Sequence, residues 1–414
     1  MRFNVHALKN GKSVVYQYET DGSRIWDPSG TEIFSEQILD SVIPSHLPFT
    51  RNINPNKKSQ KNDLLEIMLG GKCNFKCEYC SQLPIRDSVY SSNPADVEPF
   101  IDLLKGANID CSRIQLWGGE PLVYWKVLQK LVPLLRDLYP KTPIMIITNG
   151  FLLDLEKAVF FVEHNICCGI SHDGPAQSKR GEDVLNKKQV LDAVNYIKGK
   201  NPNLLMFGCT PSKGNLNVEN VIHFFNTKGV DGNRVCVHNI VRCHISSSLA
   251  QKESCYLTQE ERDLYSDSVF ELLNSGYQGS IANKRDAVVY TILSKASLNT
   301  VRAECNLPFS NGLMVNLKGD IFQCHNHAIP SAKQGNLADL ANVNAIGYEY
   351  WENKKRCREC PYIHACKGGC PSSDDLANEL ACPNLKALYK GIYKAAFASL
   401  LGIYVTDITP CEGD

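Results

Sequence analysis

A chain of 414 residues that is 43% hydrophobic and 21% charged has the composition of an ordinary globular protein of two or three domains. Basic and acidic residues number 44 each, and this balance gives no electrostatic footprint for a nucleic-acid partner. No stretch approaches the roughly 20 apolar residues of a membrane span, and the N-terminus lacks the apolar core of a secretory signal. We therefore expect a cytoplasmic, reducing compartment, where cysteines act more often as ligands or catalysts than in disulfides. The chain has 18 cysteines.

The N-terminal residues, 1–50, are predicted to form a small β-hairpin unit. Apolar and polar residues alternate in "RFNVHAL" and "SVVYQYE", and "KNGK" and "TDGS" supply turn residues between them. The polar, basic stretch that follows, 51–62, is predicted to be a solvated linker.

Between residues 63 and 242, apolar runs of strand length alternate with helix-like segments. This alternation predicts parallel strands covered by helices. Six strands fit a doubly wound sheet or a partial (β/α)6 barrel, and in both folds the functional residues lie at the carboxyl ends of the strands. The predicted strands are "LLEIML" (64–69), "RIQLW" (113–117), "PIMIIT" (143–148), "CCGIS" (167–171), "NLLMFG" (203–208) and "RVCVHNI" (234–240), and the helices are 95–106, 122–138, 152–163, 187–199 and 217–228.

The remaining chain divides into three predicted parts. A helical bridge, 243–299, contains helices over 259–275 and 284–297. A cysteine-rich domain with little periodicity follows at 300–390. The chain ends with an apolar-rich helix and a tail, 391–414, and the helix is expected to begin near residue 384.

The stretch "GGKCNFKCEYCSQ" (70–82) directly follows the first strand of this β/α region and has the spacing C-x3-C-x2-C. Structural zinc normally takes four ligands in paired motifs, so three unequally spaced cysteines fit it poorly. A four-iron cluster is usually held by four thiolates. Three thiolates leave one iron open for a small chelating ligand.

This cysteine pattern, with Tyr79 before the last cysteine, resembles the signature of the radical S-adenosylmethionine (SAM) superfamily. The resemblance implies that SAM chelates the open iron, and that its reductive cleavage gives methionine and a 5′-deoxyadenosyl radical that abstracts hydrogen from a substrate. It also implies an α/β fold with a partial (β/α)6 barrel. A cysteine-rich zinc loop is the alternative.

Three further segments at strand ends resemble the SAM-binding segments of that superfamily. "WGGEPL" (117–122) would receive the SAM amino group, "SHDGP" (171–175) would bind the ribose, and an arginine beyond it would pair with the SAM carboxylate. For the polar residues, ordinary turn chemistry is the alternative, and for the arginine, a surface position. His172 replaces a frequent leucine and is given no role. The resemblance implies contacts with SAM from Tyr79, Gly118, Gly119, Glu120, Pro121, Thr148, Asn149, Ser171, Asp173 and Arg180.

The C-terminal cysteines resemble the SPASM domain, an iron–sulfur extension found in many radical SAM enzymes that modify peptides. "GNLAD" (335–339) also matches that domain. The resemblance implies two auxiliary [4Fe–4S] clusters, three clusters in all, and a zinc ribbon is the alternative. One auxiliary cluster would be held by Cys357, Cys360, Cys366 and Cys382. The other would be held by Cys305, Cys324 and Cys370. The third cluster is the SAM-binding one, held by Cys73, Cys77 and Cys80.

The cluster of Cys305, Cys324 and Cys370 lacks an obvious fourth ligand. Its remaining iron is either open or bound by Cys243, Cys255 or Cys411. Five other cysteines fall in or beside strands and are predicted to be small core residues. These are Cys111, Cys167, Cys168, Cys209 and Cys236.

Sulfatase maturases of this family carry a catalytic aspartate directly after the cysteine that corresponds to Cys324. Here "HNH" (325–327) follows, which speaks against formylglycine formation. His325 or His327 is a candidate proton acceptor, because histidine titrates near neutrality. The alternative is that they only tune a cluster through hydrogen bonds.

The sequence therefore predicts a radical SAM/SPASM maturase that forms a carbon–sulfur or carbon–carbon crosslink, or an oxidised side chain, in a ribosomally made peptide. The alternatives are action on a small metabolite and a non-catalytic iron–sulfur module. The expected partners are the peptide and an electron donor such as a flavodoxin or ferredoxin, with no nucleic acid and no membrane. The N-terminal unit is too short for a winged-helix leader-binding domain, so an extended peptide would bind by strand addition.

Overall fold

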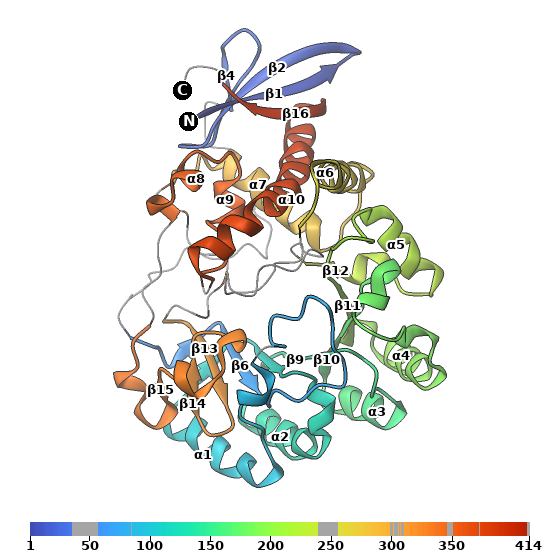
Figure 1. Ribbon diagram of the computed structural model, residues 1–414, viewed down its shortest axis with the longest axis vertical. Helices are drawn as coiled ribbons and strands as arrows, with labels where there is room; N and C mark the ends of the chain where they lie inside the picture. Colours follow the sequence, from blue (N-terminus) through green and yellow to red (C-terminus); the bar gives the residue numbers. More distant parts are fainter. Residues whose placement is uncertain are drawn as a thin grey trace.

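The computed structural model describes residues 1–34, 57–83, 85–238, 256–298, 301, 305, 307, 310–345, 351–371 and 373–411. A small sheet and a large sheet lie at opposite ends of the molecule, with helices between them (Figure 1). None of the helices in these ranges is long and apolar enough to cross a lipid bilayer.

The large sheet contains all six predicted strands of the β/α region. They are parallel neighbours in chain order, without the reversal that marks a doubly wound sheet. The partial-barrel prediction is confirmed, and the doubly wound alternative is wrong. The strands are β6 (Leu64–Met68), β8 (Ile114–Trp117), β9 (Ile144–Thr148), β10 (Ile166–Ser171), β11 (Leu205–Cys209) and β12 (Val235–Val237).

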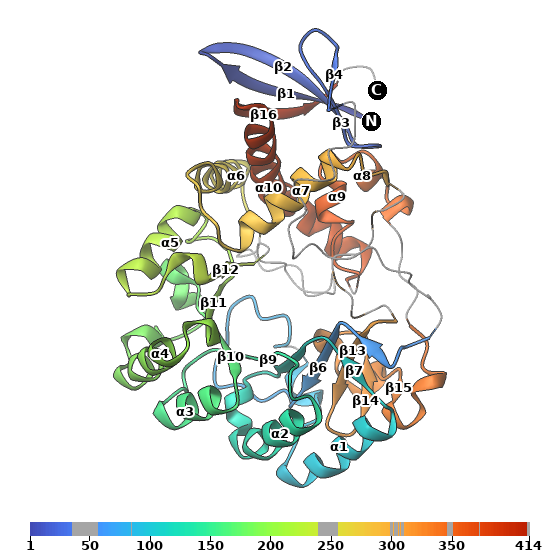
Figure 2. The ribbon, with the colours of Figure 1, turned by 180° about the vertical axis from the view of Figure 1, so that it is seen from behind.

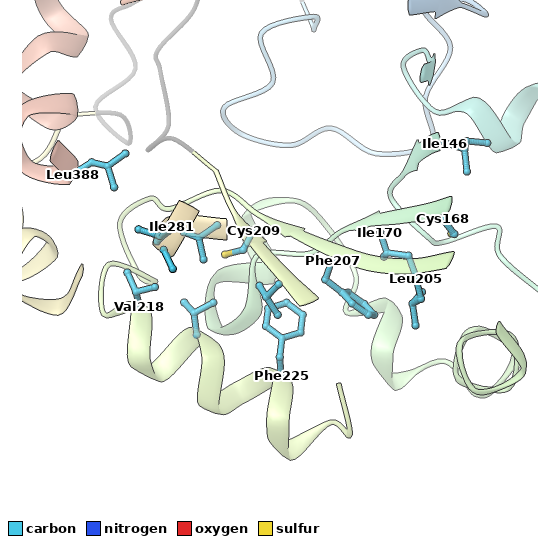
Figure 3. Close-up of a cluster of buried hydrophobic side chains, with 14 of the residues drawn as sticks. Ile146, Cys168, Ile170, Leu205, Phe207, Cys209, Val218, Phe225, Ile281 and Leu388 are labelled. Atoms are coloured by element: carbon cyan, nitrogen blue, oxygen red, sulfur yellow. The ribbon is translucent and has the colours of Figure 1, made fainter. Parts of the chain in front are cut away.

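Five helices run along the outside of these strands, as Figures 1 and 2 show. Their buried stripes pack on alternate strand residues, because successive side chains of a strand point to opposite faces. Figure 3 shows Phe225 of one helix below Phe207 of β11, and both side chains are fully buried. The helices are α1 (Val97–Gly106), α2 (Trp125–Leu138), α3 (Leu155–Glu163), α4 (Lys188–Lys200) and α5 (Val218–Thr227).

The sheet continues beyond the predicted barrel. β13 (Gly312–Asn316) pairs in parallel with β6, and β14 (Asp320–Phe322) and β15 (Gly335–Asn336) extend it in antiparallel fashion. The start of the cysteine-rich region therefore belongs to the same sheet as the first barrel strand. This pairing carries the segment after Cys324 to the mouth of the barrel.

The predicted N-terminal hairpin is present, but its sheet includes the far end of the chain. β16 (Tyr404–Pro410) pairs antiparallel with β1 at one edge, and the strand order is β16-β1-β2-β3-β4. The C-terminal segment predicted as a helix and a tail therefore ends in a strand. The N-terminal strands are β1 (Arg2–Lys9), β2 (Lys12–Glu19), β3 (Arg24–Trp26) and β4 (Glu32–Ile33).

Three long helices connect the two sheets. α10 (Asp375–Leu401) packs along α6 (Gln259–Asn274), and a side chain at Gly391 would clash with the carbonyl of Ser266. α7 (Ser280–Leu293) also contacts α10. The short helices α8 (Lys355–Arg358) and α9 (Ile363–Cys366) carry part of the cysteine-rich region, and α10 ends at Gly402, which adopts a positive φ of 62°.

The segment predicted as a solvated linker is only partly exposed where the structure describes it, at residues 57–62. Lys58 is 5% exposed, and its Nζ donates hydrogen bonds to the carbonyls of Leu307 (2.6 Å) and Gly312 (2.8 Å). β5 (Lys61–Asn62) pairs with β7 (Asp110–Cys111). This segment fastens the cysteine-rich region to the barrel.

The pairing of β16 with β1 generates a stability prediction. Val405 of β16 is completely buried, so Val405→Ala should destabilise the protein by roughly 2 kcal/mol through lost apolar burial. The neighbouring exposed residue supplies the control, and Thr406→Ala should change stability by less than about 0.5 kcal/mol. Anaerobic urea unfolding measures both, and equal midpoints for the two variants would contradict the role of β16.

Candidate functional site

The three cysteines of the C-x3-C-x2-C motif lie in one loop between β6 and the turn at Arg86–Ser88. Burial is the main cause that raises the pKa of Cys77, to about 11, and the charges of Cys80 and Cys73 raise it further. Burial likewise raises the pKa of Cys73. The three thiols are therefore close enough to interact electrostatically, and this arrangement fits a single shared iron–sulfur cluster.

Two glycine pairs bring this loop against the end of β8. The N–H of Gly119 donates to the carbonyl of Gly70 (2.8 Å), and the N–H of Glu120 donates to that of Lys72 (2.9 Å). A side chain at Gly119 would clash with the carbonyl of Gly71. Gly118 and Gly119 therefore allow the backbone after β8 to lie directly against the cysteine loop.

The carboxylate of Glu120 holds two strand ends together. It is 1% exposed and accepts hydrogen bonds from Thr148 Oγ1 (2.6 Å) and from the backbone N–H groups of Asn149 (2.7 Å) and Leu122 (2.9 Å). Burial raises its pKa, while these donors favour the ionised form. Glu120 therefore holds the ends of β8 and β9 together through hydrogen bonds. Pro121 begins the buried turn that follows.

The neighbouring Asn149 links Glu120 to the cluster loop. Its Nδ2 donates to Asn74 Oδ1 (2.8 Å) and approaches Cys73 Sγ at 3.9 Å. Gly118 lies close to the carbonyl of Gly70. The predicted contacts on β8 and β9 are thus brought together around the cysteine loop.

Tyr79, Asp173 and Arg180 form a buried group on the other side of the loop. The Tyr79 hydroxyl donates to Asp173, and Arg180 donates to the Tyr79 hydroxyl (2.9 Å) and lies 3.7 Å from Asp173. Asp173 is fully buried and also accepts from the N–H of Thr210 (3.0 Å). Asp173 and Arg180 therefore pair with each other beside the cysteine loop, and their contacts with the ribose and the carboxylate of SAM stay predictions.

At the end of β10, Ser171 and His172 lie on opposite faces of the sheet. Ser171 is half-buried on the face away from the helices. His172 is fully buried, its Nδ1 accepts from the N–H of Gly174 (3.0 Å), and its Nε2 lies 2.9 Å from Asp183. His172 stacks on Phe224 of α5 and therefore faces the helical layer.

The cysteines predicted to be core residues divide between the two faces of the sheet. Cys168 and Cys209 are fully buried toward the helices, and Cys111 is buried. Cys167 and Cys236 are only half-buried, because they alternate with the helix-facing residues. The core prediction is wrong for these two, which line the inner face.

His325 lies on the inner face of the barrel, against two side chains that the sequence analysis did not select. Its Nδ1 is 2.7 Å from Glu66 Oε1 of β6, and its ring stacks on Trp117 of β8 at 4.4 Å between centroids. Glu66 is 2% exposed. The acidic residue within the apolar run "LLEIML" was a signal in the sequence, since a buried carboxylate needs a partner.

The segment around His325 also contacts the cluster loop. Gln82 Nε2 donates to the carbonyl of His325 (3.1 Å), and Ser81 Oγ donates to Asn326 Oδ1 (3.0 Å). His327 is half-buried, and burial is the main cause that lowers its pKa. The SAM motif and the cysteine-rich region therefore share one interface.

The C-terminal cysteines gather in two groups. Cys357, Cys360, Cys366 and Cys382 line one cavity with Lys386 and Tyr389. Burial is the main cause that raises the pKa of Cys324, and the charges of Glu66, Cys370 and Cys305 raise it further. The two auxiliary clusters and their ligand sets stay predictions.

Three cysteines were candidates for the fourth ligand of the cluster of Cys305, Cys324 and Cys370, and the structure describes one of them. Cys243 and Cys255 lie outside the described residues. Cys411 follows β16, and its thiol donates to Asn4 Oδ1 (3.3 Å). Figures 1 and 2 place β16, which Cys411 directly follows, at the far end of the molecule from β14, which leads into Cys324. Cys411 is therefore not a ligand of that cluster.

Three buried nitrogen donors around the cysteine loop support a bound group there. Arg86 Nε, Trp117 Nε1 and Arg180 Nε have no hydrogen-bond partner among the described residues. Buried polar groups are normally satisfied, so these three donors are free to bind a further acceptor. The sulfides of a cluster and the oxygens of SAM are acceptors of the required kind.

Comparisons with known proteins agree with this geometry. Residues 67–215 match the family model of the Radical SAM superfamily. The serine-type anaerobic sulfatase-maturating enzyme of Bacteroides thetaiotaomicron is 25% identical over 363 residues, which cover 79% of this chain and 86% of that protein.

Two solved structures share the fold. Native anSMEcpe with bound AdoMet and Cp18Cys peptide superposes with a TM-score of 0.60 at 21% identity, covering 82% of this chain and 98% of the other. Streptococcus suis SuiB bound to precursor peptide SuiA gives a TM-score of 0.52 at 14% identity, covering 77% and 76%. The radical SAM fold is therefore confirmed.

The environment of His172 generates a pH prediction. Burial lowers its pKa, and its Nδ1 must stay unprotonated to accept from Gly174. The unfolded chain therefore binds a proton more readily, and the stability that the neutral ring contributes is lost as pH falls below its ordinary value of about 6.5. The melting temperature of His172→Gln should fall less between pH 7.5 and 5.5 than that of the parent. Exposed His223→Gln is the control, and identical slopes for all three proteins would refute the assignment.

Proposed function

We propose that this radical SAM enzyme oxidises a residue of a ribosomally made peptide, forming a carbon–sulfur or carbon–carbon crosslink or an oxidised side chain. The observation that carries the proposal is the placement of His325 on Glu66 and Trp117, beside the cysteine loop. Bound at that loop, the cluster and SAM supply the hydrogen-abstracting radical. The residues of the chain would position the substrate and accept the proton that the substrate loses.

Oxidation of a substrate after hydrogen abstraction requires the loss of a proton and an electron. With Glu66 ionised, its carboxylate accepts from His325 Nδ1–H, and Nε2 is then the nitrogen with a free lone pair. The stacked indole of Trp117 holds the ring from a second side. His325 is therefore a pre-oriented proton acceptor.

Cys305, Cys324 and Cys370 would hold an auxiliary cluster, and that cluster would supply an electron acceptor beside the base. Cys324, a proposed cluster ligand, directly precedes His325 in the chain. Proton acceptor and electron acceptor would thus lie on consecutive residues. His327 is the weaker candidate for the base, because burial disfavours its protonated form. A flavodoxin or ferredoxin is the proposed source of reducing electrons.

The peptide substrate is supported by relatives. Native anSMEcpe was solved with a Cp18Cys peptide and SuiB with its precursor peptide. The described N-terminal residues, 1–34, form the strands β1 to β4. The edges of the N-terminal sheet, β16 and β4, are the proposed places for strand addition.

A first experiment distinguishes an enzyme from an electron-transfer module. Anaerobically reconstituted protein with dithionite and SAM should release 5′-deoxyadenosine, and Cys73→Ala should abolish this release because the SAM-binding cluster loses a ligand. Cys411→Ser is the matched control outside the ligand sets and should retain the parent rate. Chromatography of the products decides, and an inactive parent with full iron content would favour the module.

A second experiment tests the peptide and the base. A short peptide encoded beside this protein's gene should lose two hydrogens by mass. His325→Ala should reduce that product by about 10²–10⁴-fold, because the base is lost, while release of 5′-deoxyadenosine continues. Glu66→Gln should reduce it less, since the histidine remains. Turnover of a small molecule with an unchanged peptide mass would reject the peptide function, and full activity of His325→Ala would reject the base.

A further inference from the structure

Arg86 is the side chain that closes the cysteine loop. One guanidinium nitrogen donates to the carbonyl of Phe75 (2.7 Å), midway between the first two cysteines of the motif. The other donates to the Sγ of Cys80 at 3.3 Å, within the range of a hydrogen bond to sulfur. The two guanidinium nitrogens therefore fix both the backbone of the loop and the orientation of the Cys80 thiol.

The backbone of Arg86 is itself held in place. It begins a tight turn after the loop, and its carbonyl lies so close to Gly71 that a side chain at Gly71 would clash with it. The N–H of Val89 donates to that same carbonyl (3.4 Å). A guanidinium on such a turn loses little conformational freedom when it binds its partners.

Arg86 differs electrostatically from the other arginine at the site. The charge of Arg180 is compensated by Asp173, at 3.7 Å. No ion pair between Arg86 and a carboxylate is found within the described ranges of the chain, and its Nε is buried without a partner there. Its positive charge therefore acts mainly on the nearby thiols, and it partly opposes the rise in the pKa of Cys73 that burial causes.

We infer that Arg86 is a positioning residue that raises the reduction potential of the SAM-binding cluster through its charge and its hydrogen bond to Cys80. Net charge and hydrogen bonds to the sulfurs set the potential of such clusters. A positive charge stabilises the reduced, more negative cluster, and electron uptake is the step that precedes SAM cleavage. The inference rests on the radical SAM domain and not on the peptide substrate.

The test is a redox titration monitored by electron paramagnetic resonance, without substrate. The signal of the SAM-binding cluster is identified by its change when SAM is added. At the midpoint potential of the parent, Arg86→Met should show a roughly tenfold lower ratio of reduced to oxidised cluster, a shift of about 59 mV to more negative potential for one electron. Arg86→Lys keeps the positive charge but loses the paired donors of the guanidinium. Its midpoint potential should lie between those of the parent and of Arg86→Met.

The control is Arg136→Met, which removes a partly buried arginine that donates to backbone carbonyls such as those of Thr142 and His164. It should leave the potential unchanged. A parent-like potential for Arg86→Met with full iron content would overturn the inference. If Arg86→Met does not retain the cluster, a parent-like potential for Arg86→Lys would overturn it, and loss of the cluster from both variants would limit Arg86 to a structural role. Each of these failures leaves the proposed function standing.

Discussion

The site depends on a backbone contact between two loops that have almost no side chains where they touch. Gly70 and Gly71 after β6 meet Gly118 and Gly119 after β8, and the N–H of Gly119 bonds across the junction. Parallel strands deliver these loops to the same edge of the sheet, but ordinary side chains would hold them apart. The close approach sets where the three cysteines stand relative to the ends of the neighbouring strands.

Buried charges then hold the remaining strand ends to that junction. Glu120 ties the end of β8 to β9, while the group of Tyr79, Asp173 and Arg180 ties the cysteine loop to the end of β10. Each carboxylate is fully or almost fully buried but satisfied by several donors, which is the condition under which burial of a charge is tolerated. These side chains therefore fix the ends of β8, β9 and β10 relative to the cysteine loop.

The periodicity of the sequence predicted the barrel well, because strand order and helix cover follow from local alternation and from the handedness of β-α-β units. All six strands appear close to their predicted bounds. Pairings between distant parts of the chain were not predictable in this way. Neither the addition of β16 to β1 nor that of β13 to β6 leaves a local pattern. Arg86 was missed for the same reason, since its contact with Cys80 depends on a loop conformation.

Glu66 and His325 constrain one another, which fits the histidine found here in place of the aspartate that the resemblance to sulfatase maturases implies. An aspartate at position 325 would place a second carboxylate near Glu66, which lies 2.7 Å from the present imidazole. Two ionised carboxylates at that separation repel strongly in a buried site. A histidine instead donates one hydrogen bond to the buried acid and keeps its other nitrogen for a proton. Glu66 on the wall of the barrel and the residue after Cys324 therefore form one structural unit, and a charge change at either position alters which residue fits at the other.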